Sequence, residues 1–142
     1  MVSDISFGYA DGGHSCCIIK YKGLEFVGEA TCHPDDMDFE SERTGLCIAE
    51  ARANIKVLKF KRKFEIIPAL QSLRHLYGNM RSSKKYNPKS YEAQMIRSQL
   101  RALEKELDTI SNDIVEEEKY LNEYIQKKDI FYKKLRAKNN NL

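Results

Sequence analysis

The last third of the chain carries an apolar pattern that few folds can accommodate. From Tyr91 onward, apolar side chains recur in alternating steps of four and three residues, with a weak point at Glu117. The seam comprises Ile96, Leu100, Leu103, Leu107, Ile110, Ile114, Leu121, Tyr124 or Ile125, Phe131 and Leu135. This rhythm is typical of a coiled coil. We therefore expect a helix over residues 91–137, which at ~1.5 Å per residue would span roughly 65 to 70 Å. Such a helix must fold back on another helix of the chain or pair with a second chain.

Residues 1–33 show the two-residue period of β-strands instead. Three alternating runs are separated by Asp11-Gly12-Gly13 and by Lys22-Gly23, whose glycines can supply the positive φ angles of tight turns. This pattern predicts a three-stranded antiparallel meander. A two-residue turn at Lys22-Gly23 would gather apolar side chains on one face: Cys17, Ile19, Tyr21, Leu24, Phe26, Ala30 and Cys32, with Ile5 and Phe7 beside them. We expect this face to pack on a helix.

Residues 34–80 begin as an acidic turn and continue as a helix, with Thr44 or Ser41 as the expected N-cap. The apolar stripe of that helix comprises Cys47 or Ile48, Ala51, Ile55 and Leu58. Pro68 lacks the amide that an α-helix needs, so we expect a kink or a restart of the helix near residues 65–67.

Residues 81–90 are predicted to form a loop, with Ser90 capping the last helix, and residues 138–142 form a frayed tail. Together these patterns predict a single α+β domain over residues 1–142. In it, a three-stranded antiparallel β-meander packs on a long antiparallel two-helix arm that resembles a coiled coil.

Charge is divided unevenly along the chain. Residues 1–51 carry 3 basic and 10 acidic side chains, whereas residues 52–89 carry 11 basic and 1 acidic. The cations that we single out are Lys56, Lys59, Arg62, Lys63, Lys84, Lys85 and Lys89. A surface of this kind attracts the phosphate backbone of nucleic acids. The alternative is a solvated face neutralised by acids of the last helix, such as Glu116, Glu117 and Glu118.

The acidic turn offers a second candidate surface, formed by Asp35, Asp36, Asp38, Glu40 and Glu42. Negative charge before a helix favours the positive end of its dipole, which explains much of this cluster. A divalent cation is an alternative ligand, although the EF-hand pattern and its glycine are absent. We favour contact with a basic surface of a partner protein.

Four cysteines and the absence of a signal peptide or an apolar run of spanning length indicate a reducing cytoplasm. The best geometric case for zinc joins His14, Cys32, His33 and Cys47, at the junction between sheet and helix. The spacing is not a standard zinc pattern, and buried free thiols are the preferred interpretation. We expect no other cofactor.

No sequence pattern indicates an enzyme. A glycine-rich phosphate loop, an HExxH motif and paired catalytic carboxylates are all missing, and His75 lies far in sequence from any thiol. We therefore expect a protein that acts by binding.

Two stretches resemble known families. The strands followed by IAEARANIKVL resemble the second half of a double-stranded RNA-binding domain, but acids stand where that family places lysines, which argues against binding of RNA duplexes. The block TCHPDDMDFESERTGLCIAEARANIK, followed by YNPKSYE, is similar to small accessory proteins of phages and prophages of Gram-positive bacteria.

This second resemblance implies an inhibitor of host defence, such as an anti-CRISPR protein, which occupies the surface of a nucleic-acid-handling nuclease in the bacterial cytoplasm. The charged patches would form the contact. The alternatives are a nucleic-acid-binding accessory protein that uses the basic residues, or a structural zinc-binding module. The seam leaves open whether the chain is a monomer or a homodimer through the helical arm.

Overall fold

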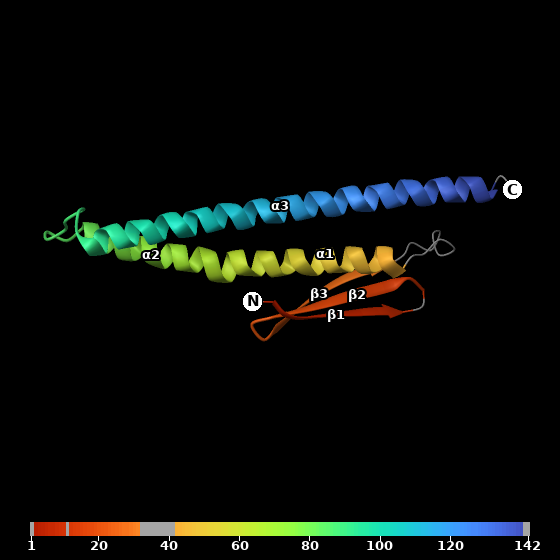
Figure 1. Ribbon diagram of the computed structural model, residues 1–142, viewed down its shortest axis with the longest axis horizontal. Coiled ribbons are helices and arrows are strands. Elements are labelled where there is room, and N and C mark those ends of the chain that lie inside the picture. The colour runs from red at the N-terminus through yellow and green to blue at the C-terminus, as the bar shows by residue number, and fades with distance from the viewer. Residues whose placement is uncertain (1, 11, 32–41, 141–142) are drawn as a thin grey trace. The chain divides into compact units, whose positions relative to one another are not determined.

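The computed structural model describes residues 2–10, 12–31 and 42–140. In chain order the elements are β1 (Val2–Ala10), β2 (His14–Tyr21), β3 (Leu24–Thr31), α1 (Glu42–Lys61), a π-helical segment η2 (Arg62–Ile66), α2 (Ile67–Arg81) and α3 (Tyr91–Asn140), as Figure 1 shows. The predicted α+β class, with a three-stranded antiparallel sheet, is confirmed.

Contacts divide the chain into two compact units. We call residues 1–57 together with 115–142 the sheet unit, and residues 58–114 the hairpin unit. No helix in the described ranges combines the length and the hydropathy that crossing a membrane requires.

The sheet has the order β1-β2-β3 and the register that the sequence predicts. Tyr21 pairs with Leu24 across the Lys22-Gly23 turn. Lys22 and Gly23 have φ angles of 51° and 78°, the left-handed conformation that the central residues of a tight hairpin adopt. On the other side Ile5 pairs with Ile19, and the hairpin closes through Gly12 and Gly13, also at positive φ.

Helix α1 packs against the inner face of the sheet at very short range. A Cβ atom added to Gly28 would lie 2.0 Å from the carbonyl oxygen of Ala49 and 2.5 Å from the amide nitrogen of Ala53. At Gly45 the added atom would lie 2.2 Å from Oγ of Ser15. The small residues on both sides therefore bring the backbones of strand and helix together.

The inner face of the sheet is only partly covered. Cys17 and Ile19 are fully buried, but Ile5, Phe7 and Leu24 remain 47%, 52% and 47% exposed. The expectation that the whole apolar face packs on a helix therefore holds for the centre of the sheet and fails at its margins. One helix of small residues is too narrow to cover three strands.

The hairpin unit consists of α2 folded back on the first half of α3, so the predicted antiparallel helix pair is confirmed within this unit. Its core joins Ile66 to Ile110 and Ile114, with Leu58 and Leu107 packed against them. The heptad seam of the last helix thus faces a helix of the same chain over this part of its length.

The irregularity expected at Pro68 is present. The π-helical segment ends at Ile66, and the amide of Ile67 bonds to the carbonyl of Arg62, five residues back. Because Pro68 lacks an amide and its ring crowds the preceding turn, a wide turn just before it relieves the conflict.

Two predicted boundaries change. Helix α1 already begins at Glu42, so Thr44 lies inside it, buried, and cannot be the N-cap; the competing choice, Ser41, lies outside the described residues. Helix α3 runs to Asn140, beyond the predicted end at residue 137. Residues 138–140, predicted as part of a frayed tail, are helical, although none of them is apolar and the seam does not extend into them.

Candidate functional site

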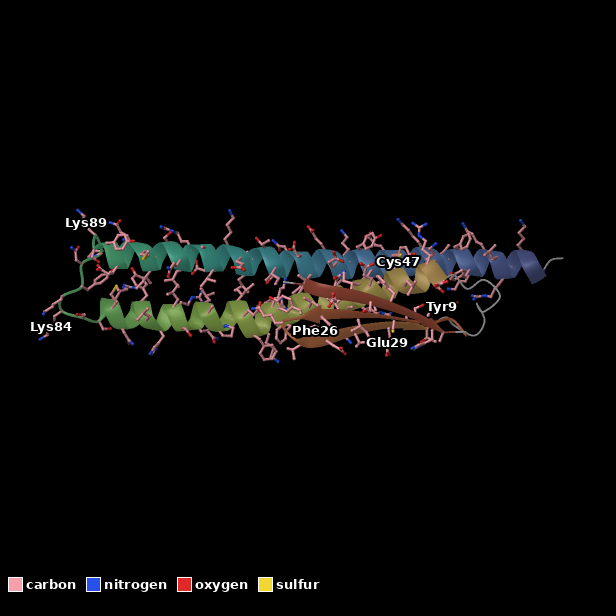
Figure 2. The ribbon with its side chains drawn as sticks, turned by 60° about the horizontal axis from the view of Figure 1, so that its bottom comes forward. Tyr9, Phe26, Glu29, Cys47, Lys84 and Lys89 are labelled. Carbon is pink, nitrogen blue, oxygen red and sulfur yellow. The ribbon has the colours of Figure 1, made fainter. Side chains whose placement is uncertain are left out.

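A cluster of cations surrounds the loop that joins α2 to α3. We call Arg81, Lys84, Lys85 and Lys89 the basic tip. All four side chains are exposed, and Figure 2 shows Lys84 and Lys89 extending from this loop. Residues 81–91 contain no acid, and among the residues that the structure describes, none of the four forms an ion pair.

Two tyrosines and an arginine hold the loop against the helices. The hydroxyls of Tyr77 and Tyr86 lie 3.0 Å apart, and the two rings meet edge to face with centroids 6.4 Å apart. Arg97 donates one hydrogen bond to the hydroxyl of Tyr86 at 3.4 Å and another to the carbonyl of Pro88 at 2.6 Å. The lysines are therefore presented from a braced loop.

The same contacts shift the acidity of the phenols. Side-chain hydrogen bonding to Arg97, followed by that to Tyr86, lowers the pKa of Tyr77. The hydrogen bond with Tyr77 raises the pKa of Tyr86. The guanidinium of Arg97, bonded to this loop, adds a fifth positive charge next to the four of the basic tip.

The local sequence explains the loop. Oγ of Ser90 accepts a hydrogen bond from the amide of Ala93 at 3.2 Å, which confirms Ser90 as the N-cap of α3. Oδ1 of Asn87 accepts one from the amide of Lys89 at 3.0 Å and makes a compact Asx-type turn. Lys89 thus lies next to the positive end of the α3 dipole, where anions are stabilised.

This arrangement suits a ligand that carries several phosphates. Unpaired, exposed ammonium groups keep their full hydration and mobility, and they gain most from a polyanion that releases its condensed counterions on binding. The nearest ion pair of the hairpin unit, Arg74 with Glu104 at 3.4 Å, lies outside the loop.

The other predicted cations form a separate group. Lys59, Arg62 and Lys63 lie near the start of the hairpin unit, about 20 residues before the basic tip, or ~30 Å along a helix. Nζ of Lys56 donates to the carbonyl of Val27 at 2.5 Å. Lys56 therefore belongs to the sheet unit and is bonded to β3, apart from the cations of the hairpin unit.

The acidic candidate surface lies mostly outside the described residues, which include neither Asp35, Asp36, Asp38 nor Glu40. Glu42 is exposed in the first turn of α1. It lines an open groove of about 530 Å³ in the sheet unit together with Phe7, Arg43, Leu46, Cys47 and Glu50.

Of the four candidate zinc ligands, Cys32 and His33 lie outside the described residues. Nδ1 of His14 lies 3.2 Å from Oγ1 of Thr31. Cys47 is exposed, and it contacts Tyr124 of α3. Within the described ranges no three His, Cys, Asp or Glu side chains gather as metal ligands would.

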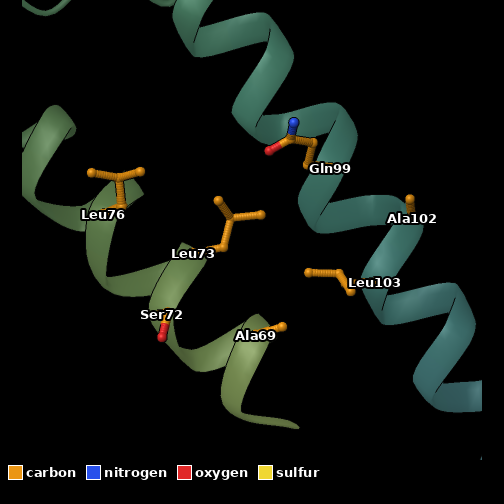
Figure 3. Close-up of a pocket in the computed structure, with 7 residues that line it drawn as sticks. All are labelled: Ala69, Ser72, Leu73, Leu76, Gln99, Ala102 and Leu103. Atoms are coloured by element: carbon orange, nitrogen blue, oxygen red, sulfur yellow. The ribbon is translucent and has the colours of Figure 1, made fainter. Parts of the chain in front are cut away.

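An apolar groove of about 470 Å³ runs between α2 and α3 (Figure 3). Its lining comprises Ala69, Ser72, Leu73, Leu76, Gln99, Ala102 and Leu103. Small side chains at three of these positions leave the groove open.

Sequence reasoning missed Arg97 and the tyrosine pair. The available signal was a cation at position 97, directly beside Ile96 of the apolar seam. A half-buried arginine in such a place needs acceptors, and the nearby loop supplies a carbonyl and a phenol.

No protein-family model, no curated protein and no solved structure matches this chain.

Proposed function

We propose that the protein is a non-enzymatic accessory protein of the phage type, which inhibits a host defence nuclease, and that it makes contact through phosphates at the basic tip. The observation that carries the proposal is the tip itself: four exposed cations on a braced loop, with no acid in residues 81–91. The nucleic acid on which such a nuclease acts carries a phosphate backbone, which attracts cations of this kind. The resemblance of the residue 31–56 block to phage accessory proteins supports the choice of partner.

Charge reversal at the tip tests the phosphate contact. Lys84→Glu/Lys85→Glu should lower the affinity for labelled single- and double-stranded DNA and RNA at least tenfold, measured by fluorescence anisotropy. The slope of log affinity against log salt should fall by about 0.7 to 0.9 for each phosphate that the variant no longer neutralises. Lys127→Glu/Lys134→Glu changes the net charge equally at exposed sites of α3, and this control should retain the wild-type slope.

Capture from a bacterial lysate, with and without nuclease treatment, tests the partner. A defence nuclease should be retained by the wild type and lost with the tip variant. Equal nucleic-acid affinity in the tip variant and the charge control would contradict the phosphate contact. Retention of nucleic acid alone would leave the accessory nucleic-acid-binding protein as the better account.

The acidic residues remain a competing contact surface, because a nuclease also offers a basic groove. Reversal of Asp35, Asp36 and Asp38 should then abolish capture of the nuclease while anisotropy with nucleic acid stays unchanged. The two variants therefore separate the two surfaces by opposite patterns of loss.

A further inference from the structure

The two edges of the three-stranded sheet differ in how their outward backbone groups are satisfied. At the β3 edge, Nη1 of Arg52 donates to the carbonyl of Glu29 at 2.6 Å, and Nζ of Lys56 donates to the carbonyl of Val27 at 2.5 Å. Arg52 and Lys56 lie one turn apart on α1. Their positive charges occupy the edge, which is a recognised way of preventing a further strand from adding there.

These contacts also establish which residues of β1 face outward. Because the carbonyl of Val27 points away from β2, its register partner Ile18 directs its own backbone groups towards β1, where it pairs with Ser6. Backbone direction alternates along a strand, so the amides and carbonyls of Ile5 and Phe7 point away from the sheet.

The β1 edge lacks the protection found at β3. The nine residues VSDISFGYA contain no lysine, arginine or proline. Ile5 and Phe7 are 47% and 52% exposed, and within the described ranges no side chain bonds to the backbone of either residue. A long edge strand with exposed apolar side chains is a site for strand addition.

We propose that β1 pairs with β1 of a second copy of this chain, antiparallel, about a twofold axis at Ser6, to form a continuous six-stranded sheet. In this register Ile5 of each copy lies opposite Phe7 of the other, and the outward groups of both residues become hydrogen-bonded. A twofold axis at Ser6 pairs residues 4–8 of the two copies, a stretch of regular register, and leaves the register shift between Val2 and Asp4 at the end of the paired segment.

The strand can pair with its own copy without charge repulsion and with matched side chains, which favours a second copy over a foreign peptide. Asp4, the single charged residue of β1, would lie opposite Gly8, so the two Asp4 carboxylates remain ~13 Å apart at strand rise. An aliphatic side chain opposite an aromatic one is a favourable cross-strand pair, and the proposed register contains two. The apolar face of each sheet thereby continues into the other.

Charge substitution at the proposed axis is the sharpest test, because Ser6 would face its own copy. Sedimentation of the full chain should give about twice the 16.5 kDa mass. Ser6→Lys and Ser6→Glu should each raise the dissociation constant of the dimer at least tenfold, since like charges would oppose each other. An equimolar mixture of the two variants should restore the dimer.

Glu29→Gln provides a matched control, because it raises the net charge by one, as Ser6→Lys does, but on β3. The dimer should persist in this variant. A wild-type monomer at all accessible concentrations, a dimer that survives both single substitutions, or a mixture that fails to restore association would each overturn the proposal. If the dimer survives both single substitutions, its interface must be formed elsewhere, by the helices or by the groove of Figure 3.

Cross-linking gives an independent readout of register. Ser6→Cys would place two thiols in a non-hydrogen-bonded pair, at a Cα separation near 4.5 Å that a disulfide can span. Mild oxidation should yield a covalent dimer well above the background of the native cysteines. Asp4→Cys should stay at that background, because its thiol would lie opposite Gly8; equal cross-linking of both variants would contradict the register.

Discussion

The sheet unit and the hairpin unit bury their cores in different ways. In the sheet unit a helix backbone contacts a strand backbone at Gly28, with little side-chain volume between them. In the hairpin unit, branched side chains such as Ile110 and Ile114 fill the space between two helices. The core of the sheet unit therefore requires a glycine at the contact, whereas the core of the hairpin unit requires large apolar side chains.

The largest effect should follow from adding one carbon to the sheet unit. Gly28→Ala would place Cβ 2.0 Å from the carbonyl oxygen of Ala49, so strand and helix must separate. We expect a loss of about 4 kcal/mol in the free energy of unfolding, because backbone atoms cannot rotate aside as side chains do. Faster hydrogen exchange of the β2 and β3 amides, which reports the free energy of opening, would measure this loss of stability.

Gly78→Ala is the matched control in the hairpin unit. Nothing lies within 4 Å of the added Cβ, and the position is inside α2. This variant should gain about 0.5 to 1 kcal/mol from helix propensity. Equal effects of the two substitutions would remove the distinction between the units.

Removing carbon should be the more damaging change in the hairpin unit. Ile110→Ala empties part of the cluster formed with Ile66 and Ile114 and should cost about 3 kcal/mol. Urea unfolding followed by circular dichroism would measure the loss. Val115→Ala, on α3 directly after the hairpin unit, removes an exposed side chain and should change stability by less than about 0.5 kcal/mol.

A smaller effect is expected at the loop of the hairpin unit. Arg97→Met keeps much of the apolar stem but removes the hydrogen bonds to Tyr86 and to the carbonyl of Pro88. We expect a local loss of about 1 kcal/mol, visible as faster hydrogen exchange near Ser90, with the sheet unit unchanged. Unaltered exchange in this loop would show that the tyrosine pair alone holds it.

Ser15 offers a stabilising change in the sheet unit. It is fully buried, and among the described residues its hydroxyl has no hydrogen-bond partner. Ser15→Ala should therefore raise the free energy of unfolding by up to about 1 kcal/mol, measured by thermal unfolding. A loss of stability would mean that the hydroxyl is satisfied after all, for example by water.

The smallest effect should be a pH dependence specific to the sheet unit. Burial, followed by Glu50 and Cys16, raises the pKa of the Cys17 thiol. The neutral Cys17 thiol contributes its full stabilisation of the fold below the pKa of the unfolded thiol, about 8.5. This contribution is lost as the pH rises through the higher pKa of the thiol in the folded protein. Cys17→Ala should flatten the stability profile between neutral and alkaline pH, as unfolding measured at a series of pH values would show.

Local periodicity was sufficient to predict most of the fold. Alternation and turn chemistry determine the strand register, because a slip of one residue would turn Cys17 and Ile19 to the opposite face. The seam predicted α3 and its antiparallel partner within the hairpin unit. These features depend on neighbours in sequence or on a repeated step, which one chain displays directly.

The site was less predictable because it depends on contacts that no period encodes. Along the sequence Lys56 belongs to a row of cations, yet in the fold it bonds to the edge of the sheet. The role of Arg97 depends on the loop, because its acceptors Tyr86 and Pro88 are 11 and 9 residues away in sequence. Charge counts locate a surface, but tertiary placement decides which cations remain available to a ligand.

The π-helical segment before Pro68 has a consequence for how this chain tolerates change in length. A turn with an extra residue sets the direction in which every later side chain of α2 points. Deleting Lys63 would remove the extra residue of this turn, so residues 67–81 would keep nearly the same direction about the helix axis and Leu70 would stay in the core. The same deletion in a regular α-helical turn, for example at Ser72 of α2, would rotate the residues after it by about 100°. We therefore expect the hairpin unit to tolerate a deletion at Lys63 better than one at Ser72, a difference that thermal unfolding would measure.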